Sequence, residues 1–194
     1  YYTAHSPALL NLLFGSQITF YAFLFAPIVL VMIISSKINS LSASMASFLF
    51  FVYSAVTGVT LSAIFLMYTQ ESIATTFGIT AGTFGATALF GYVTKKDLSK
   101  MGSILFMLLI GLIIASVVNM FLKNDTMMWI LTYVGIVIFV GLTAYDMQKL
   151  KKIAHSIDDD ESSIAKFAVL GALTLYLDFI NLFLRLLQIF GKKR

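Results

Sequence analysis

The chain contains no cysteine, only two prolines and two histidines, and few charged residues. The absence of cysteine excludes disulfide bonds and thiolate metal sites, and composition therefore says nothing about the redox compartment. Charged residues make up 11% of the 194 residues, whereas hydrophobic residues make up 59%. A soluble domain of this length does not need so much apolar surface, so the composition predicts a polytopic membrane protein.

The excess of basic residues is small, with a net charge of +4. The basic residues lie in short connections and at the C-terminus, which is typical of membrane topology and not of nucleic-acid binding. We therefore expect the lipid bilayer to be the main partner, and we expect no nucleic acid.

Six apolar segments approach the roughly 20 residues that a helix needs to cross the hydrocarbon core. They cover residues 17–35, 42–68, 72–93, 101–122, 126–147 and 164–190. Helices are predicted because open sheet edges cannot survive in lipid and because the segments are long, continuous apolar runs. The connections are short, the longest being 148–163, so residues 1–194 are predicted to form a single all-α membrane domain.

Two features within the spans predict local packing. Gly78 and Gly82 form a small-xxx-small pair, which lets two helices approach closely. Pro27 predicts a kink in the first span. In the longest connection, the run from Asp158 to Glu161 lacks the alternating ligands and the glycine of a calcium-binding loop, so we interpret it as a solvated loop.

Lysine placement predicts the orientation in the membrane. Alternate connections are rich in lysine, whereas those between them carry only Lys123. The lysine-rich connections are predicted to be cytoplasmic. The basic tail Lys192–Arg194 conflicts with this rule if the last segment crosses the membrane. Either the earlier loops set the topology, or the last segment does not cross completely.

Apart from Lys166 at the very start of the last span, only three charged residues fall within the apolar spans: Asp146, Asp178 and Arg185. A charge at membrane depth is costly, so it usually faces protein or water and marks a functional site. Asp146 lies at the predicted cytoplasmic end of the fifth span, and Asp178 lies in the middle of the sixth. A purely structural carboxyl remains the alternative for each, and Asp146 has the additional alternative of pairing with nearby lysines.

The last span carries a regular stripe of small and polar residues. Its members are spaced three or four residues apart: Gly171, Thr174, Asp178, Asn181, Arg185 and Gln188. This spacing keeps them on one side of a helix. A single polar stripe in lipid must face protein or water, so the last span is predicted to be central. Asn181 is a plausible hydrogen-bond donor to Asp178.

If Asp146 and Asp178 meet, they form a pair that takes up protons as a unit, because two adjacent carboxylates repel each other when both are ionised. Protonated, the pair shares a hydrogen bond that holds two helices together; ionised, it can open a path. Carboxylate oxygens also suit calcium, so the same two residues are predicted to be transient calcium ligands.

Two stretches carry a resemblance to a known family. They are Gly171 to Phe183, containing Leu-Tyr-Leu-Asp178-Phe-Ile-Asn181-Leu-Phe, and Ala144-Tyr145-Asp146 before a lysine-rich loop. Over its whole length the chain resembles the transmembrane Bax inhibitor motif (Bax inhibitor-1) family, bacterial inner-membrane members above all. The resemblance implies seven transmembrane helices with the last one central, and a pH-dependent calcium leak with Asp146 and Asp178 as its sensor. Residues 1–14 would then be the end of a missing first helix and its exit loop.

The chain also departs from the family pattern. Related members carry a glutamate in the second helix, where this sequence has apolar residues around Ala26 and Pro27. Some relatives have an arginine that latches one aspartate, but only Lys37 lies in the corresponding region here. The basic residue late in the last helix is present as Arg185, and Gln188 stands where several relatives have arginine.

The sequence supports one principal function and two alternatives. The principal reading is a proton-gated calcium leak with no bound cofactor, in which Asp146 and Asp178 sense pH and Thr174, Asn181 and Arg185 support them. The first alternative is a non-conducting regulator that binds other membrane proteins in stress or cell-death control. An intramembrane aspartyl protease is disfavoured, because Tyr176-Leu177-Asp178 lacks the glycines of the Gly-x-Gly-Asp signature, and we expect no enzyme activity.

Overall fold

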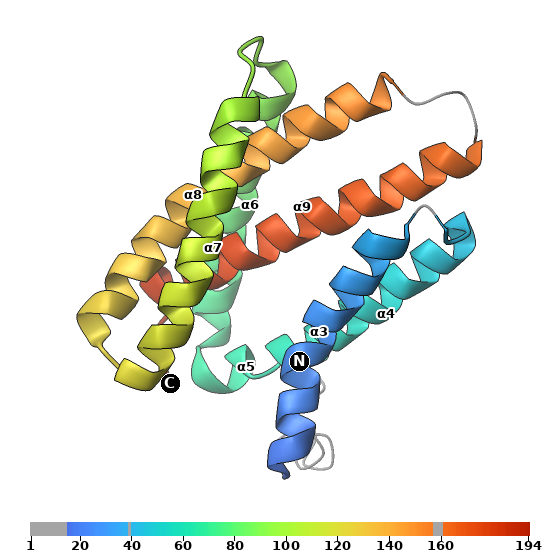
Figure 1. The fold of residues 1–194 in the computed structure, drawn as a ribbon. Helices are drawn as coiled ribbons and strands as arrows, with labels where there is room; N and C mark the ends of the chain where they lie inside the picture. Colours follow the sequence, from blue (N-terminus) through green and yellow to red (C-terminus); the bar gives the residue numbers. More distant parts are fainter. Residues whose placement is uncertain (1–14, 39, 157–160) are drawn as a thin grey trace. The chain divides into compact units, whose positions relative to one another are not determined.

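The computed structural model describes residues 15–38, 40–156 and 161–194, and every element in these ranges is a helix (Figure 1). The long helices are α3 (Gln17–Lys37), α4 (Ala43–Leu61), α6 (Gln70–Val93), α7 (Ser99–Leu122), α8 (Asp125–Ala154) and α9 (Glu161–Phe190). A short helix, α5 (Ile64–Met67), follows α4. The prediction of an all-α membrane protein is therefore confirmed.

Five helical stretches of the described chain are long and apolar enough to cross a membrane: Ala43–Met67, Gln70–Val93, Ser99–Leu122, Asp125–Ala154 and Ser163–Phe190. The first predicted span corresponds to α3, which continues through Pro27 and whose described apolar stretch is Ala26–Lys37. The proposed remnant of a further helix at residues 1–14 lies outside the described residues. The implied count of seven helices thus stays a prediction.

The predicted bounds of the second span, 42–68, agree with the helical stretch Ala43–Met67. The helix is nevertheless interrupted between Leu61 and Ile64, where the backbone N–H groups of Ser62 and Phe65 make short-range turn bonds. One predicted boundary is wrong. The connection expected at 148–163 is much shorter, because α8 runs on to Ala154 and α9 already begins at Glu161. Lysines in this last part of α8 favour helix, since cations stabilise the negative end of the helix dipole.

The described chain divides into two compact units. The first contains residues 15–70 of the described chain, the start of α9 up to Leu173, and the tail 192–194. Within it, α3 packs against α4. The second contains residues 71–156 and 174–191, and hence most of α6, all of α7 and α8, and the second part of α9.

In the first unit, the C-terminal tail pairs with the end of the second span. The N–H of Thr69 donates to the carbonyl of Lys192 at 3.0 Å, and the N–H of Arg194 donates to the carbonyl of Met67 at 3.0 Å. This pairing joins the tail to the connection between the second and third spans. It favours the alternative in which α9 crosses completely, and the 30 residues of α9 reach about 45 Å, which exceeds the hydrocarbon core.

The core of the second unit lies between α7, α8 and α9. Its buried side chains are Leu105, Leu112, Ile138, Phe139, Leu142, Leu182 and Leu186. Phe179 of α9 makes edge-to-face contacts with Phe77 and Phe84 of α6, at ring-centre distances of 5.3 and 5.5 Å. The second part of α9 therefore contacts both α6 and the α7–α8 pair. Lipid is as apolar as these side chains, so close packing, more than water exclusion, must stabilise the unit.

Close helix approach occurs at a different glycine from the one expected. A Cβ atom built on Gly78 or Gly82 meets no atom of the described structure within 4 Å. A Cβ atom on Gly91, about two and a half turns after Gly82 in α6, would overlap the backbone carbonyl of Ala144 in α8. Within this unit the prediction of a Gly78–Gly82 packing motif is therefore wrong, because glycine spacing alone does not say which face of α6 meets a neighbour.

Candidate functional site

The site is built on α8 and α9, which bring the two predicted aspartates together. The carboxyl groups of Asp146 and Asp178 are joined by a side-chain hydrogen bond. Asp178 is only 5% exposed, and Asp146 is partly buried. A hydrogen bond between two carboxyl groups requires a shared proton. The protonation of Asp146 on α8 is therefore coupled to that of Asp178 on α9.

The surroundings of the pair are asymmetric. Asp146 also lies close enough to Lys149 to feel its charge, whereas Asp178 Oδ2 is buried and has no hydrogen-bond partner among the described residues. Leaving a buried carboxylate oxygen unpaired is costly, and a proton or a cation would relieve that cost. Asp178 is thus the member of the pair whose charge depends most on what enters the site.

The polar stripe of α9 faces α8 along three successive contacts. Asp178 meets Asp146, the Arg185 side chain lies against Gly135, and the Thr132 hydroxyl donates to Gln188 Oε1 at 2.7 Å. The two helices run antiparallel, so the residue numbers of successive contacts increase along α9 and decrease along α8. The polar stripe is turned toward protein in this unit.

The supporting residues of the stripe take different roles. Asn181 Nδ2 donates to the carbonyl of Leu177 at 2.9 Å, one turn back in the same helix, so the suggested bond from Asn181 to Asp178 is not the contact that it makes. Arg185 is about 10 Å along the helix from Asp178 and packs its Nε against Gly135. Thr174 lies one turn before Asp178 and is partly buried.

Two glycines position the Asp146 end of the pair. Gly91 of α6 lies against the carbonyl of Ala144, and Gly102 of α7 lies against the ring of Tyr145. A side chain at Gly91 would displace the α8 backbone immediately before Asp146, and one at Gly102 would force the Tyr145 ring to move. Neither position stands out in the sequence, because a glycine in an apolar helix gives no signal of what it touches.

The pair offers few ligands for a resident metal ion. In the described ranges, no three acidic, histidine or cysteine side chains come together. Calcium takes six to eight oxygen ligands, so two carboxylates would have to be completed by water and backbone oxygens. Such a set suits a cation in transit better than one held permanently.

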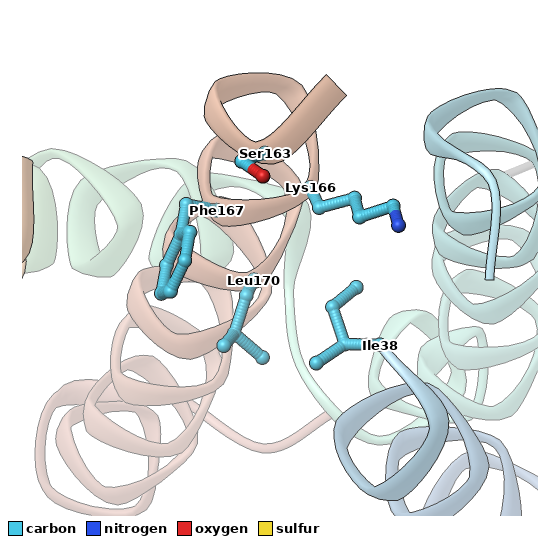
Figure 2. A pocket seen from close by; sticks show the side chains of 5 residues that line it. All are labelled: Ile38, Ser163, Lys166, Phe167 and Leu170. Atoms are coloured by element: carbon cyan, nitrogen blue, oxygen red, sulfur yellow. The ribbon is translucent and has the colours of Figure 1, made fainter. Parts of the chain in front are cut away.

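A pocket in the first unit is of a different kind. Figure 2 shows Ile38 facing Leu170 and Lys166 of α9, and Phe167 of the same helix also lines the pocket. Ser163 completes the lining, and the volume is about 100 Å³. One cation and no carboxylate line it among the described residues, so this pocket does not suit a divalent cation.

An ion pair joins the last turn of α8 to Asp97, which lies in the α6–α7 connection outside the membrane spans. Lys152 Nζ donates to Asp97 Oδ1 at 2.7 Å, and this bond with two from Ser99 lowers the pKa of Asp97 to about 2, from an ordinary value of 3.8. A lowered folded-state pKa gives a contribution that is present above the unfolded value and is lost only as pH falls through about 2.

We therefore expect Asp97→Asn to leave any pH response between about pH 5 and 8 unchanged, because Asp97 stays ionised throughout that range in the wild type. The thermal unfolding temperature of the detergent-solubilised variant and wild type, measured across this range, should run in parallel. Curves that diverge on acidification would show that Asp97 takes up protons there.

The chain as a whole is similar to known proteins. A family model described as "Inhibitor of apoptosis-promoting Bax1" matches residues 2–194. The chain is 53% identical to inner membrane protein YbhL of Escherichia coli, over all of this chain and 83% of that protein. It is 47% identical to a protein of Borreliella burgdorferi, over all of this chain and 84% of that one, and 34% identical to a membrane protein of Streptococcus pyogenes, over 95% and 79%.

Proposed function

The chain belongs to the Bax1-I family, the inhibitors of apoptosis-promoting Bax1, and on this premise we propose that it is a pH-sensitive calcium leak of the membrane, gated by Asp146 and Asp178. The observation that carries the proposal is the hydrogen bond between the two carboxyl groups across α8 and α9. Both residues lie in helices long and apolar enough to span the bilayer.

The proposed gate works through the charge of the pair. With a shared proton, the pair keeps its interhelical hydrogen bond and holds α8 against α9. With both groups ionised, the carboxylates repel each other in a medium of low dielectric, and the separated oxygens attract a divalent cation. Acidification should therefore reduce calcium flux, because it neutralises the cation-attracting charge and restores the bond between the helices.

An unpaired oxygen of Asp178 supports this proposed response to protons and cations. Its Oδ2 atom is buried without a hydrogen-bond partner among the described residues, whereas the neighbouring stripe residues Asn181 and Gln188 have theirs. An oxygen in that state gains more from a proton or a cation than one already satisfied. Arg185, two turns away, supplies a positive charge further along the same stripe and would limit cation occupancy there.

We place the protein in a bacterial inner membrane, as the name of its Escherichia coli relative indicates for that protein. The lysine-rich connections would face the cytoplasm. We propose no enzymatic reaction: the sequence before Asp178 lacks the protease glycines, and the pair is assigned to proton sensing.

The test is calcium flux in proteoliposomes that contain only the purified chain. A calcium-sensitive dye inside the vesicles reports entry, and we expect flux above empty liposomes that falls as both sides are moved from about pH 8 to about pH 5.5. Flux equal to that of empty liposomes at every pH would favour the alternative function, a non-conducting regulator of other membrane proteins. Crosslinked partners recovered from the native membrane would then identify its targets.

A further inference from the structure

A basic pocket lies in the second unit, at the ends of two membrane-spanning helices. It is formed by the α6–α7 connection and the last turns of α8, and it has a volume of about 440 Å³. The lining residues are Thr94, Lys95, Lys96, Asp97, Gln148, Lys151, Lys152 and His155. Four lysines against one aspartate give the lining a net charge of +3, with histidine neutral.

The wall of this pocket is held in place by Gln148. Its side chain is 6% exposed, accepts a hydrogen bond from the N–H of Leu98 at 2.9 Å and donates one to the carbonyl of Lys96 at 2.8 Å. These two bonds fix both sides of Asp97 in the connection to α8. Gln148 thus holds the α6–α7 connection against α8, so that the pocket is formed before a ligand binds.

Two of the lysines already have structural contacts. Lys151 Nζ donates to the carbonyl of Tyr92 at 2.8 Å and lies 4.7 Å from the centre of the Tyr92 ring. Lys152 pairs with Asp97. Both also lie in the last turn of α8, where a cation offsets the helix dipole. Contacts within the protein are therefore enough to explain why lysine occupies these two positions.

The other two lysines have no such explanation. The side-chain amines of Lys95 and Lys96 make no hydrogen bond or ion pair with any described residue, and both side chains are exposed. His155 Nδ1 is bonded to the carbonyl of Lys151 at 2.7 Å, so its Nε2 is the ring nitrogen left to face a ligand. The pocket thus presents two uncommitted ammonium groups beside two oriented ones.

We propose that this pocket binds the phosphate of an anionic membrane lipid. Its position at the ends of α6 and α8 puts the lysines at the depth of the lipid headgroups. Basic pockets at the cytoplasmic ends of transmembrane helices recognise such headgroups, and each nearby lysine contributes to the attraction of an anionic surface. The inference concerns binding and does not depend on the proposed calcium leak.

The test is native mass spectrometry of the purified full chain in detergent, titrated with phosphatidylglycerol and, separately, with phosphatidylcholine of the same acyl chains. We expect the wild type to bind the anionic lipid preferentially at one site. The double variant Lys95→Ser with Lys96→Ser should bind it about 25-fold more weakly, near fivefold for each lysine removed. A charge-retaining Lys95→Arg with Lys96→Arg variant should keep most of the affinity.

The matched control is Lys100→Ser with Lys149→Ser. It removes the same two charges from neighbouring exposed lysines that do not line the pocket, and it should bind like the wild type. Equal weakening in both double variants would overturn the proposal, because it would show a general surface attraction. Tighter binding of inorganic phosphate than of the anionic lipid would overturn the lipid as ligand and identify a soluble phosphate site. Equal binding of the two lipids would exclude headgroup recognition.

Discussion

Replacing Asp178 by asparagine should abolish the pH dependence of calcium flux in proteoliposomes. Asparagine is close in shape to aspartic acid but cannot ionise, so the variant keeps a neutral polar group against Asp146 at every pH. The repulsion that separates α8 from α9 therefore never develops. The site also keeps only one of the two carboxylates that attract the cation. Flux should stay low and change by less than about twofold across the range in which the wild type responds.

The experiment has a matched control in Asp97→Asn. Both changes remove one carboxylate, but Asp97 is exposed, pairs with Lys152 outside the spans and stays ionised down to about pH 2. Its variant should keep the full pH response. If Asp178→Asn conducts with the same pH profile as the wild type, the aspartate pair is not the sensor. Asp146→Asn should behave like Asp178→Asn, since the proposed signal belongs to the pair.

Substituting alanine for Gly91 should destabilise the protein by about 1–3 kcal/mol, which is the usual cost of forcing extra atoms into a packed contact. The added methyl group would overlap the backbone carbonyl of Ala144, and a backbone atom cannot rotate away as a side-chain tip can. The helices must separate at this point, two residues before Asp146. Unfolding of detergent-solubilised protein by heat, followed by circular dichroism, measures the loss.

Gly82→Ala provides the comparison on the same helix. A Cβ atom there meets no described atom within 4 Å, and alanine is the better helix former by up to about 1 kcal/mol. The variant should therefore be as stable as the wild type or slightly more so. Equal destabilisation by the two substitutions would contradict the close contact between α6 and α8 at Gly91. Because that contact positions Asp146, Gly91→Ala should also weaken the pH response of calcium flux.

Much of the fold follows from the sequence because the bilayer imposes simple rules. Apolar runs of the right length must become helices, so five spans and the position of α3 could be predicted without coordinates. The same rules did not predict the interruption near Ser62 or the end of α8 at Ala154. Both depend on local hydrogen bonds and helix-end charges, which hydrophobicity does not report.

By itself, the sequence determined that the protein is helical, that it lies in a membrane, and that Asp146 and Asp178 are the carboxylates its spans must accommodate. A charged residue in an apolar span can be recognised from the sequence alone, because the cost of moving its charge out of water does not depend on the fold. Only the tertiary structure decided that the two carboxyl groups meet, that Asn181 bonds to Leu177, and that Gly91 is where α6 approaches α8. These depend on the rotation and register of each helix, which are set by packing between side chains far apart in the sequence.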